Sequence, residues 1–255
     1  MKVAGFNVNS LRARLQILLD WIEKESPDIL CLQETKVPDK FFPQKEFERR
    51  GFSVIFRGEK TFNGVAIVSK TPFKDTLYGF EDGSEASRLI SSKIQGIIIV
   101  NSYIPQGFHP LSEKFRQKLD WLQRLYYYFK ENYTPQMPII WTGDFNIAPE
   151  PIDVYDPQFL NGHVGFHPDE RAVLMKFNEW GLVDVFRLHN PDGGYYTFWD
   201  YTVRNALKKG IGWRIDHIWA TQIIAKKSTK AWIDIRPRLL QKPSDHTPVI
   251  AEFKI

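Results

Sequence analysis

The chain has 255 residues, of which 43% are hydrophobic and 25% charged, and its formal net charge is +4. It contains no run of about 18 or more apolar residues, which argues against a membrane span, and its single cysteine, Cys31, excludes an intrachain disulfide. The mild positive charge permits a phosphate-bearing partner but does not require one.

Hydrophobic patterning predicts the elements of the first half of the chain. Residues 2–8 read as a short strand, and the apolar face of a following helix comprises Leu11, Leu15, Leu18, Leu19 and Ile22. Pro27 ends this helix. Further strands are predicted at residues 28–33, 64–69, 88–94 and 96–104.

The second half begins with a long helix from about Ser112, and a buried strand follows at residues 137–142. Residues 168–180 are predicted to form a helix, with Pro168 at its first position and Gly181 as its C-terminal cap. The chain closes with strands at residues 214–221, 230–235 and 247–253. Strands outnumber helices, and no repeat or linker interrupts them, so a single α/β domain is the simplest interpretation.

Several strands that are distant in the chain begin or end with polar side chains. These residues are Asn7, Asn9, Glu34, Tyr103, Asp144, Asn146, Asp216, Asp245 and His246. For any one of them alone, a turn, a cap or a satisfied core pair is the simpler explanation. The complete set is harder to explain in that way, because it combines four carboxylates, three amides, an imidazole and a phenol.

The chemistry of this set favours one class of reaction. Carboxylate and amide oxygens are the ligands that Mg²⁺ prefers, and an Asp beside a His can act as an oriented acid–base pair. The sequence has no HExxH, no GxSxG and no P-loop. The inventory therefore points to Mg²⁺-assisted attack of water on a phosphate ester.

Residues 139–149, IIWTGDFNIAP, show the pattern most clearly. An apolar strand ends in Gly143, where we expect the backbone to turn tightly at the rim of a sheet. Asp144 and Asn146 are two residues apart, so in an extended chain both point the same way, while Phe145 points into the core.

At this point the sequence resembles a known family. The segments FNVNSLRAR, DILCLQETK, SYIPQG, TGDFNIAPEPIDVYDP, GFHPDERA, YYTFWDY, GWRIDH and SDHTPV are similar, in order, to motifs of the exonuclease III family of apurinic/apyrimidinic endonucleases. The wider superfamily of DNase I-like nucleases and phosphatases shares the Glu, Asp-x-Asn and Asp-His elements. GWRID and TFWDY narrow the resemblance to DNA repair.

The resemblance implies a fold and a function. The fold would be a four-layered α/β sandwich over residues 1–255, with two packed mixed sheets, helices outside and the active site on one rim. The substrate would be duplex DNA with an abasic site, cut on its 5′ side to leave a 3′-hydroxyl and a 5′-deoxyribose phosphate. Blocked 3′ ends would be further substrates, for 3′→5′ exonuclease and 3′-phosphodiesterase activity. Mg²⁺ would be the cofactor, with Mn²⁺ as a substitute.

The resemblance also implies roles for the polar set. Glu34 would be the main Mg²⁺ ligand, and the wider metal set would add Asn7, Asp144, Asn146, Asp245 and His246. Asp144 would orient or deprotonate the attacking water, and Asn146 would position it. His246, oriented by Asp216, and Tyr103 would contact the scissile phosphate.

Two groups of residues would bind the DNA itself. Phe198, Trp213 and Ile215 would line a small pocket for the base-less sugar, although core packing also explains these side chains. Contacts to the duplex would come from Asn9, Arg12, Lys36, Gln106, Arg204, Lys208 and Arg214, each of which could instead be a solvated surface residue. We expect a monomer without membrane association, located in the cytoplasm because the chain shows no signal peptide, and at the nucleoid in a prokaryote.

The sequence departs from the family pattern at one position, and two alternative functions remain open. Ser10 stands where the family usually has Gly, so it carries strain if this turn requires a positive φ. A superfamily phosphodiesterase or phosphatase acting on lipid or inositol phosphates is one alternative, against which the aromatic and basic segment 195–214 argues. A non-catalytic DNA-binding repair accessory is the other, against which the complete polar set argues.

Overall fold

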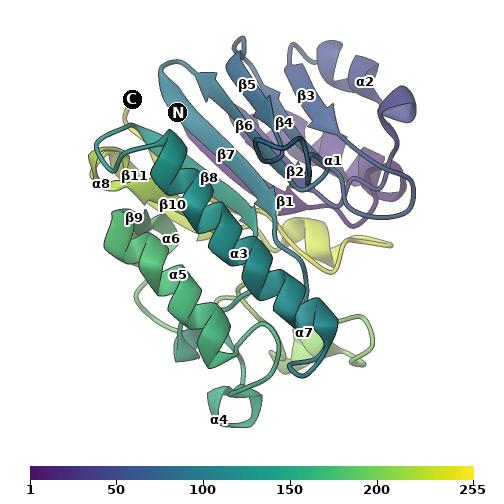
Figure 1. Ribbon diagram of the computed structural model, residues 1–255. Coiled ribbons are helices and arrows are strands. Elements are labelled where there is room, and N and C mark those ends of the chain that lie inside the picture. The colour runs from purple at the N-terminus through teal and green to yellow at the C-terminus, as the bar shows by residue number, and fades with distance from the viewer.

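The computed structural model describes residues 1–255, and two six-stranded sheets pack face to face within it (Figure 1). The strands of the first sheet are, in spatial order, β11 (Ser228–Ile233), β12 (Val249–Phe253), β1 (Lys2–Asn7), β2 (Ile29–Gln33), β4 (Val65–Ser69) and β3 (Ser53–Arg57). Those of the second sheet are β5 (Lys74–Tyr78), β6 (Leu89–Ile94), β7 (Ile97–Tyr103), β8 (Ile139–Asp144), β10 (Asp216–Thr221) and β9 (Leu182–Asp184). Both sheets are mixed, since β1–β2 and β7–β8 are parallel pairs and the other pairs are antiparallel.

Helices cover the outer faces of both sheets. Helix α1 (Leu11–Glu25) packs on the first sheet, and α3 (Glu113–Asn132) and α5 (Pro168–Trp180) lie side by side on the second (Figure 1). The shorter helices are α2 (Gln44–Glu48), α4 (Pro157–Leu160), α6 (Val185–His189), α7 (Ala206–Lys209) and α8 (Gln222–Ala225), with 3₁₀ turns at Asp39–Phe41, Pro151–Asp153 and Arg236–Leu239. The expected four-layered sandwich is confirmed.

The caps of the long helices follow the sequence signals. The Ser112 side chain accepts a hydrogen bond from the backbone N–H of Phe115 at 3.2 Å, which satisfies one of the free donors at the start of α3. Pro168 occupies the first position of α5, and Gly181 ends this helix with a φ of +123°. Helix α3 therefore begins where expected, and α5 both begins and ends where expected.

Apolar cores between the two sheets and beneath the outer helices hold the layers together. Between the sheets, isoleucines and valines such as Ile67, Ile99 and Ile140 interdigitate. On the helix side of the second sheet, Trp141 stacks on Phe145 with ring centroids 4.0 Å apart, and both residues are fully buried. Both faces of strand β8 are covered, and all six of its residues are buried. Burial of one large apolar side chain such as Trp141 contributes about 1.5–3 kcal/mol to the free energy of unfolding.

The structure differs from the predicted elements at the edge strands of the sheets and in short segments. Strands β3, β5 and β9 were not predicted; β3 and β5 are edge strands with several exposed side chains, so their hydrophobic signal is weak. The strand predicted at 214–221 begins only at Asp216. None of the helices combines the length and the apolar character needed to cross a bilayer.

Candidate active site

Strand pairing brings the polar strand ends to one rim of the sandwich. The parallel pairs β1–β2 and β7–β8 end together, so Asn7 lies beside Gln33 and Tyr103 beside Asp144. The antiparallel strand β10 begins at this same rim, where Asp216 pairs with Asp144. The loop before β12 adds His246, which makes an isolated β-bridge with Phe198. The prediction that these distant segments meet is confirmed.

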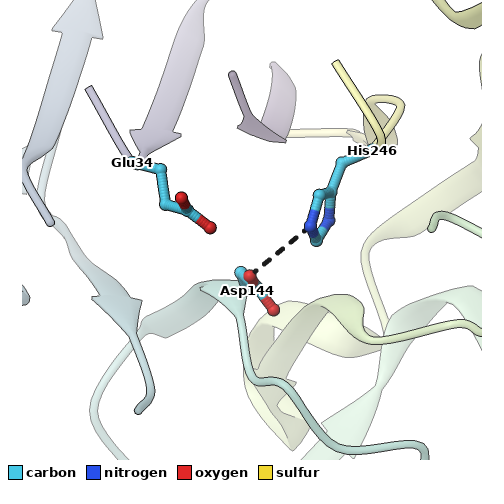
Figure 2. Close-up of side chains that lie close together, drawn as sticks. All are labelled: Glu34, Asp144 and His246. Carbon is cyan, nitrogen blue, oxygen red and sulfur yellow. Dashed lines mark ion pairs between the residues drawn. The ribbon is translucent and has the colours of Figure 1, made fainter. Parts of the chain in front are cut away.

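Three ionisable side chains converge at the centre of this rim. Glu34, Asp144 and His246 come from separate segments and point into one space (Figure 2), with one donor atom of each within 4.8 Å of the others. Burial opposes ionisation of Glu34, but the hydrogen bond and charge of Lys36 lower the pKa of Glu34 below its usual value. The acidic residues can therefore bind a metal ion, and their hard oxygen donors suit a cation such as Mg²⁺.

Asn7 braces the two carboxylates. Its Nδ2 group donates to Glu34 Oε1 and to Asp144 Oδ2, both at 2.8 Å, and its Oδ1 accepts the backbone N–H of Asn9 at 2.9 Å. The amide oxygen is thus turned toward backbone and away from the carboxylates. In this orientation Asn7 donates to the candidate metal ligands and does not join them.

Asp144 is fully buried, which changes its acidity. Burial raises the pKa of Asp144 to about 7, the charges of Asp216 and Glu34 act in the same direction, and His246 acts against them. A carboxylate with a pKa near neutrality is suited to accept a proton from water and release it again. Asp144 therefore has the acidity expected of a general base.

His246 is held between two aspartates. Its Nδ1 lies 2.8 Å from Asp216 Oδ2, and its Nε2 lies 3.8 Å from Asp144 Oδ2 (Figure 2 draws the second contact). Burial disfavours the imidazolium, but the carboxylates of Asp216 and Asp144 raise the pKa of His246 to about 10. With both ring nitrogens protonated, His246 would act as a cationic hydrogen-bond donor, whereas only a ring that has lost one proton could coordinate a metal ion.

Asn146 and Tyr103 complete the polar part of the site. Asn146 leaves the extended conformation, with a φ of +51°, and its Nδ2 donates to Asp144 Oδ2 at 3.3 Å and to the Ile104 carbonyl at 2.9 Å. Burial and the charges of Glu34 and Asp144 raise the pKa of Tyr103 well above its usual value, so the phenol stays protonated. Both residues line the cavity described next.

A cavity of about 420 Å³ opens directly beside these polar groups. Its apolar wall includes all three residues that were predicted to form a pocket, Phe198, Trp213 and Ile215. Phe198 also packs against His246, with ring centroids 4.8 Å apart. The remaining lining residues include Gln106, Tyr155, Val164, Gly165, Val203, Ile211 and Asp245. The cavity thus joins an apolar wall to the buried acid–base groups.

The structure contradicts the predicted role of Arg214 in DNA binding. Its side chain is fully buried, where Nε donates to Asp153 Oδ1 at 2.6 Å and an Nη lies 2.8 Å from Asp184 Oδ2. A second Nη donates to Nδ1 of His217 at 3.0 Å. With its donors engaged inside the protein, Arg214 holds together the loop that presents Trp213 and Asp216.

The other predicted DNA contacts differ in accessibility. Arg12, Arg204 and Lys208 are exposed, as surface contact to phosphates requires. Lys36 is half-buried and paired with Glu34, with their N and O atoms 2.6 Å apart. Asn9 donates to Asp245 Oδ1 at 2.9 Å. Asp245 itself lies on the cavity wall and outside the three converging groups, so it adjoins the candidate metal site.

Gly143 has a role other than the tight turn that was predicted. It lies inside β8 with a φ of +147°, directly opposite Ser102 of β7. A Cβ atom at this position would lie 1.9 Å from the Ser102 carbonyl oxygen. Glycine is therefore required for close approach of two strands, and the turn itself follows at Asn146.

Sequence reasoning missed the residues that support the site from behind. Oγ1 of the buried Thr197 accepts the backbone N–H groups of Ile215 and Asp216, both at 3.1 Å, and so fixes the start of β10. Arg88 lies over the ring of Tyr103 at 4.7 Å. The buried ion pair Lys118–Glu170 was also missed, because its partners lie on separate predicted helices. The one clue in the sequence was Lys118, a charged residue on the face of α3 that is otherwise apolar and buried.

Comparison with known proteins agrees with this geometry. A model of the endonuclease/exonuclease/phosphatase family matches residues 4–246. Exodeoxyribonuclease III of Haemophilus influenzae is 35% identical over the whole of both chains. An AP endonuclease structure from Archaeoglobus fulgidus is 45% identical over the whole of both chains, with a TM-score of 0.97. The structure of a Neisseria 3′ phosphatase bound to a product DNA hairpin is 34% identical over both full chains, with a TM-score of 0.96. The chain therefore belongs to the exonuclease III group of the endonuclease/exonuclease/phosphatase family.

Proposed function

We propose that this DNA repair nuclease hydrolyses the phosphodiester on the 5′ side of an abasic site in duplex DNA, with Mg²⁺ as its cofactor. The products would be a 3′-hydroxyl and a 5′-deoxyribose phosphate. The observation that carries the proposal is the cavity of about 420 Å³, whose apolar wall adjoins the buried Asp144–His246–Asp216 group. The cavity provides a place for a base-less sugar within reach of groups suited to phosphate ester hydrolysis.

The cavity supports selectivity for a damaged nucleotide. Phe198, Trp213 and Ile215 present apolar surface, which suits a deoxyribose ring turned out of the helix. The Gly165 backbone packs close to the Trp213 ring, since a Cβ atom at Gly165 would lie only 3.3 Å from that ring, so this side of the cavity is narrow. A nucleotide that retains its base would therefore be excluded by size.

The acid–base groups support the hydrolytic step. Asp144, with its pKa near neutrality, would accept a proton from the attacking water, and the Asn146 amide would help to position that water. His246, kept cationic by Asp216, would donate a hydrogen bond to a non-bridging phosphate oxygen. Tyr103, as a protonated phenol, would donate a second.

The carboxylates support a role for Mg²⁺. Glu34 would hold the cation, with Asp144 beside it and Asn7 fixing both carboxylates. When bound, the cation would neutralise charge that develops on the phosphate and on the leaving 3′ oxygen. The oxygens that Asn7 does not engage have other partners: Glu34 Oε2 pairs with the Lys36 ammonium at 2.6 Å, and Asp144 Oδ1 accepts the Asn146 backbone N–H at 2.8 Å. Each oxygen would therefore bind the cation through its remaining lone pair.

Related proteins support activity at 3′ ends as well. A Neisseria relative is described as a 3′-5′ exonuclease, and a 3′ phosphatase structure holds a product DNA hairpin. We propose that the chain likewise processes blocked 3′ ends through the same polar groups, and that it acts as a monomer. The same cluster would serve both reactions, because both hydrolyse a phosphate ester.

The proposal is tested with a panel of substrates. The protein is incubated with Mg²⁺ and a duplex that carries one tetrahydrofuran abasic analogue, with the intact duplex and an inositol phosphate as comparisons. Incision of the abasic duplex alone is expected, and EDTA should abolish it. Hydrolysis of the inositol phosphate without DNA cleavage would assign the chain to another activity of its family.

A further inference from the structure

We infer that Lys118 and Glu170 form a positioning pair that holds both walls of the active-site cavity in register. The pair joins helix α3 to helix α5, and both side chains are fully buried. Nothing in the proposed reaction uses their charges directly. The inference rests on the proposed function, because it concerns how that site is kept in its working geometry.

The Lys118 ammonium reaches the polar wall of the cavity. Its Nζ donates to the backbone carbonyl of Asn146 at 2.8 Å and to that of Gln106 at 3.2 Å, and it forms an ion pair with Glu170. Asn146 has a φ of +51°, in the left-handed region that Asn adopts more often than most residues, and the bond to Lys118 fixes the position of its carbonyl there. Lys118 thus fixes the backbone whose amide side chain contacts Asp144.

The Glu170 carboxylate reaches the apolar wall. Its Oε2 accepts the backbone N–H of Gly165 at 2.8 Å and that of His167 at 3.0 Å. Gly165 lines the cavity beside Trp213, and its carbonyl accepts the backbone N–H of Ala148 at 2.7 Å. One ion pair therefore ties the segments after β7, after β8 and before α5, which surround the reacting groups.

A buried ion pair is weak evidence for a purely stabilising role. Replacing both partners of such a pair by neutral side chains of similar volume is often neutral for stability, whereas removing one partner leaves an unpaired buried charge. A pair retained inside two long helices and bonded to four backbone groups of the site is better explained by positioning. Lys118→Met combined with Glu170→Gln separates these two roles.

The test compares incision and local backbone protection. In the double variant, the rate constant for incision of a tetrahydrofuran duplex at saturation should fall about 10- to 100-fold, while the Kd for that duplex stays within about twofold. Amide hydrogen exchange at Asn146 and Gly165 should become faster. Tyr128→Phe is the matched control, because it removes a buried hydroxyl that bonds Ser91 and Tyr133 at the other end of α3; it should leave the rate unchanged.

Each outcome is decisive. A folded double variant with the wild-type rate and exchange would overturn the inference and leave the proposed function intact. If the wild-type protein does not incise the duplex, the proposed function fails, and the exchange of the two amides still decides whether the pair holds the walls. If the double variant does not fold, Glu170→Asp serves, because it keeps the charge that pairs with Lys118 but retracts the carboxylate from Gly165 and His167; at least a threefold loss of rate at unchanged Kd would support the inference, and no loss would overturn it.

Discussion

Asp216 holds one edge of the His246 ring, with Oδ2 of the aspartate 2.8 Å from Nδ1 of the imidazole. The other edge of the ring faces Asp144, at 3.8 Å. The imidazole is therefore fixed in orientation and in charge by carboxylates on both sides, without a direct contact of Asp216 to the cavity.

Asp216→Asn should leave the shape of this pair but remove the charge that keeps His246 cationic. We expect kcat on an abasic duplex to fall about 100-fold or more, because the phosphate loses a charged donor, while Kd changes little. Steady-state incision and fluorescence anisotropy measure the two quantities. A kcat within a factor of two of the wild-type value would contradict the role assigned to Asp216.

Asp144→Asn should abolish incision, because the amide cannot accept the proton of the attacking water. The loss in the single-turnover rate should be about 1,000-fold or more, at the upper part of the range for general-base removal. Binding to the same duplex should be retained or tightened, since a negative charge next to the phosphate is removed. A variant that cuts at the wild-type rate would show that Asp144 is not the base.

Ser10→Gly should stabilise the protein. Ser10 has a φ of +85° and its side chain makes no capping hydrogen bond, so it gives strain without compensation. This bears out the strain expected from the family's usual Gly. Relief of the strain should add about 1 kcal/mol to the free energy of unfolding, or roughly 2–4 °C in Tm. Ser10→Ala is the control, and an equal gain in that variant would point to a cause other than backbone conformation.

His217 should make stability depend on pH in a defined window. The ring is fully buried, Arg214 donates to its Nδ1, and its Nε2 therefore donates to the Ile147 carbonyl at 2.9 Å as a neutral imidazole. Burial and the charge of Arg214 lower the pKa of His217 from 6.5 to about 4. Between pH 4 and 6.5, His217 is therefore protonated in the unfolded chain and neutral in the folded chain.

It follows that stability is complete above pH 6.5 and is lost as the pH falls toward 4. The full effect is roughly 3 kcal/mol, at about 1.4 kcal/mol for each pH unit between the two values. His217→Gln, which can keep an acceptor for Arg214 and a donor for Ile147, should flatten the slope of unfolding free energy in this window. Denaturant titrations at pH 7, 5.5 and 4.5 measure the slope, and identical slopes in the two proteins would refute the assignment.

The sequence predicts elements well where both faces of a strand are covered. Strands such as β4, β7 and β8 are dense in Ile and Val, and Ser112, Pro168 and Gly181 mark the ends of helices by local backbone chemistry. The edge strands β3 and β5 escape prediction because much of their surface faces water. Their strand conformation comes from pairing with a neighbour, which no local pattern records.

The candidate site, like the fold, could be predicted only in part. The sequence allowed the prediction that the polar strand ends gather at one rim, because parallel strands end together. It did not allow a prediction of which residue each polar side chain contacts. Arg214 reads as a surface cation in the sequence, yet Asp153, 61 residues away, draws it into the interior. Gly143 reads as a turn residue, yet it is needed because Ser102 of β7 approaches it closely.

The most direct test is to locate the bond that is broken. A duplex with a single tetrahydrofuran analogue, labelled at the 5′ end of the damaged strand, is incubated with Mg²⁺ and a molar excess of enzyme. One internal cut immediately 5′ to the analogue is predicted, with a 3′-hydroxyl that a polymerase can extend, and no internal cut in the intact duplex. No cut, a cut on the 3′ side of the analogue, or equal cutting of the intact duplex would contradict the account.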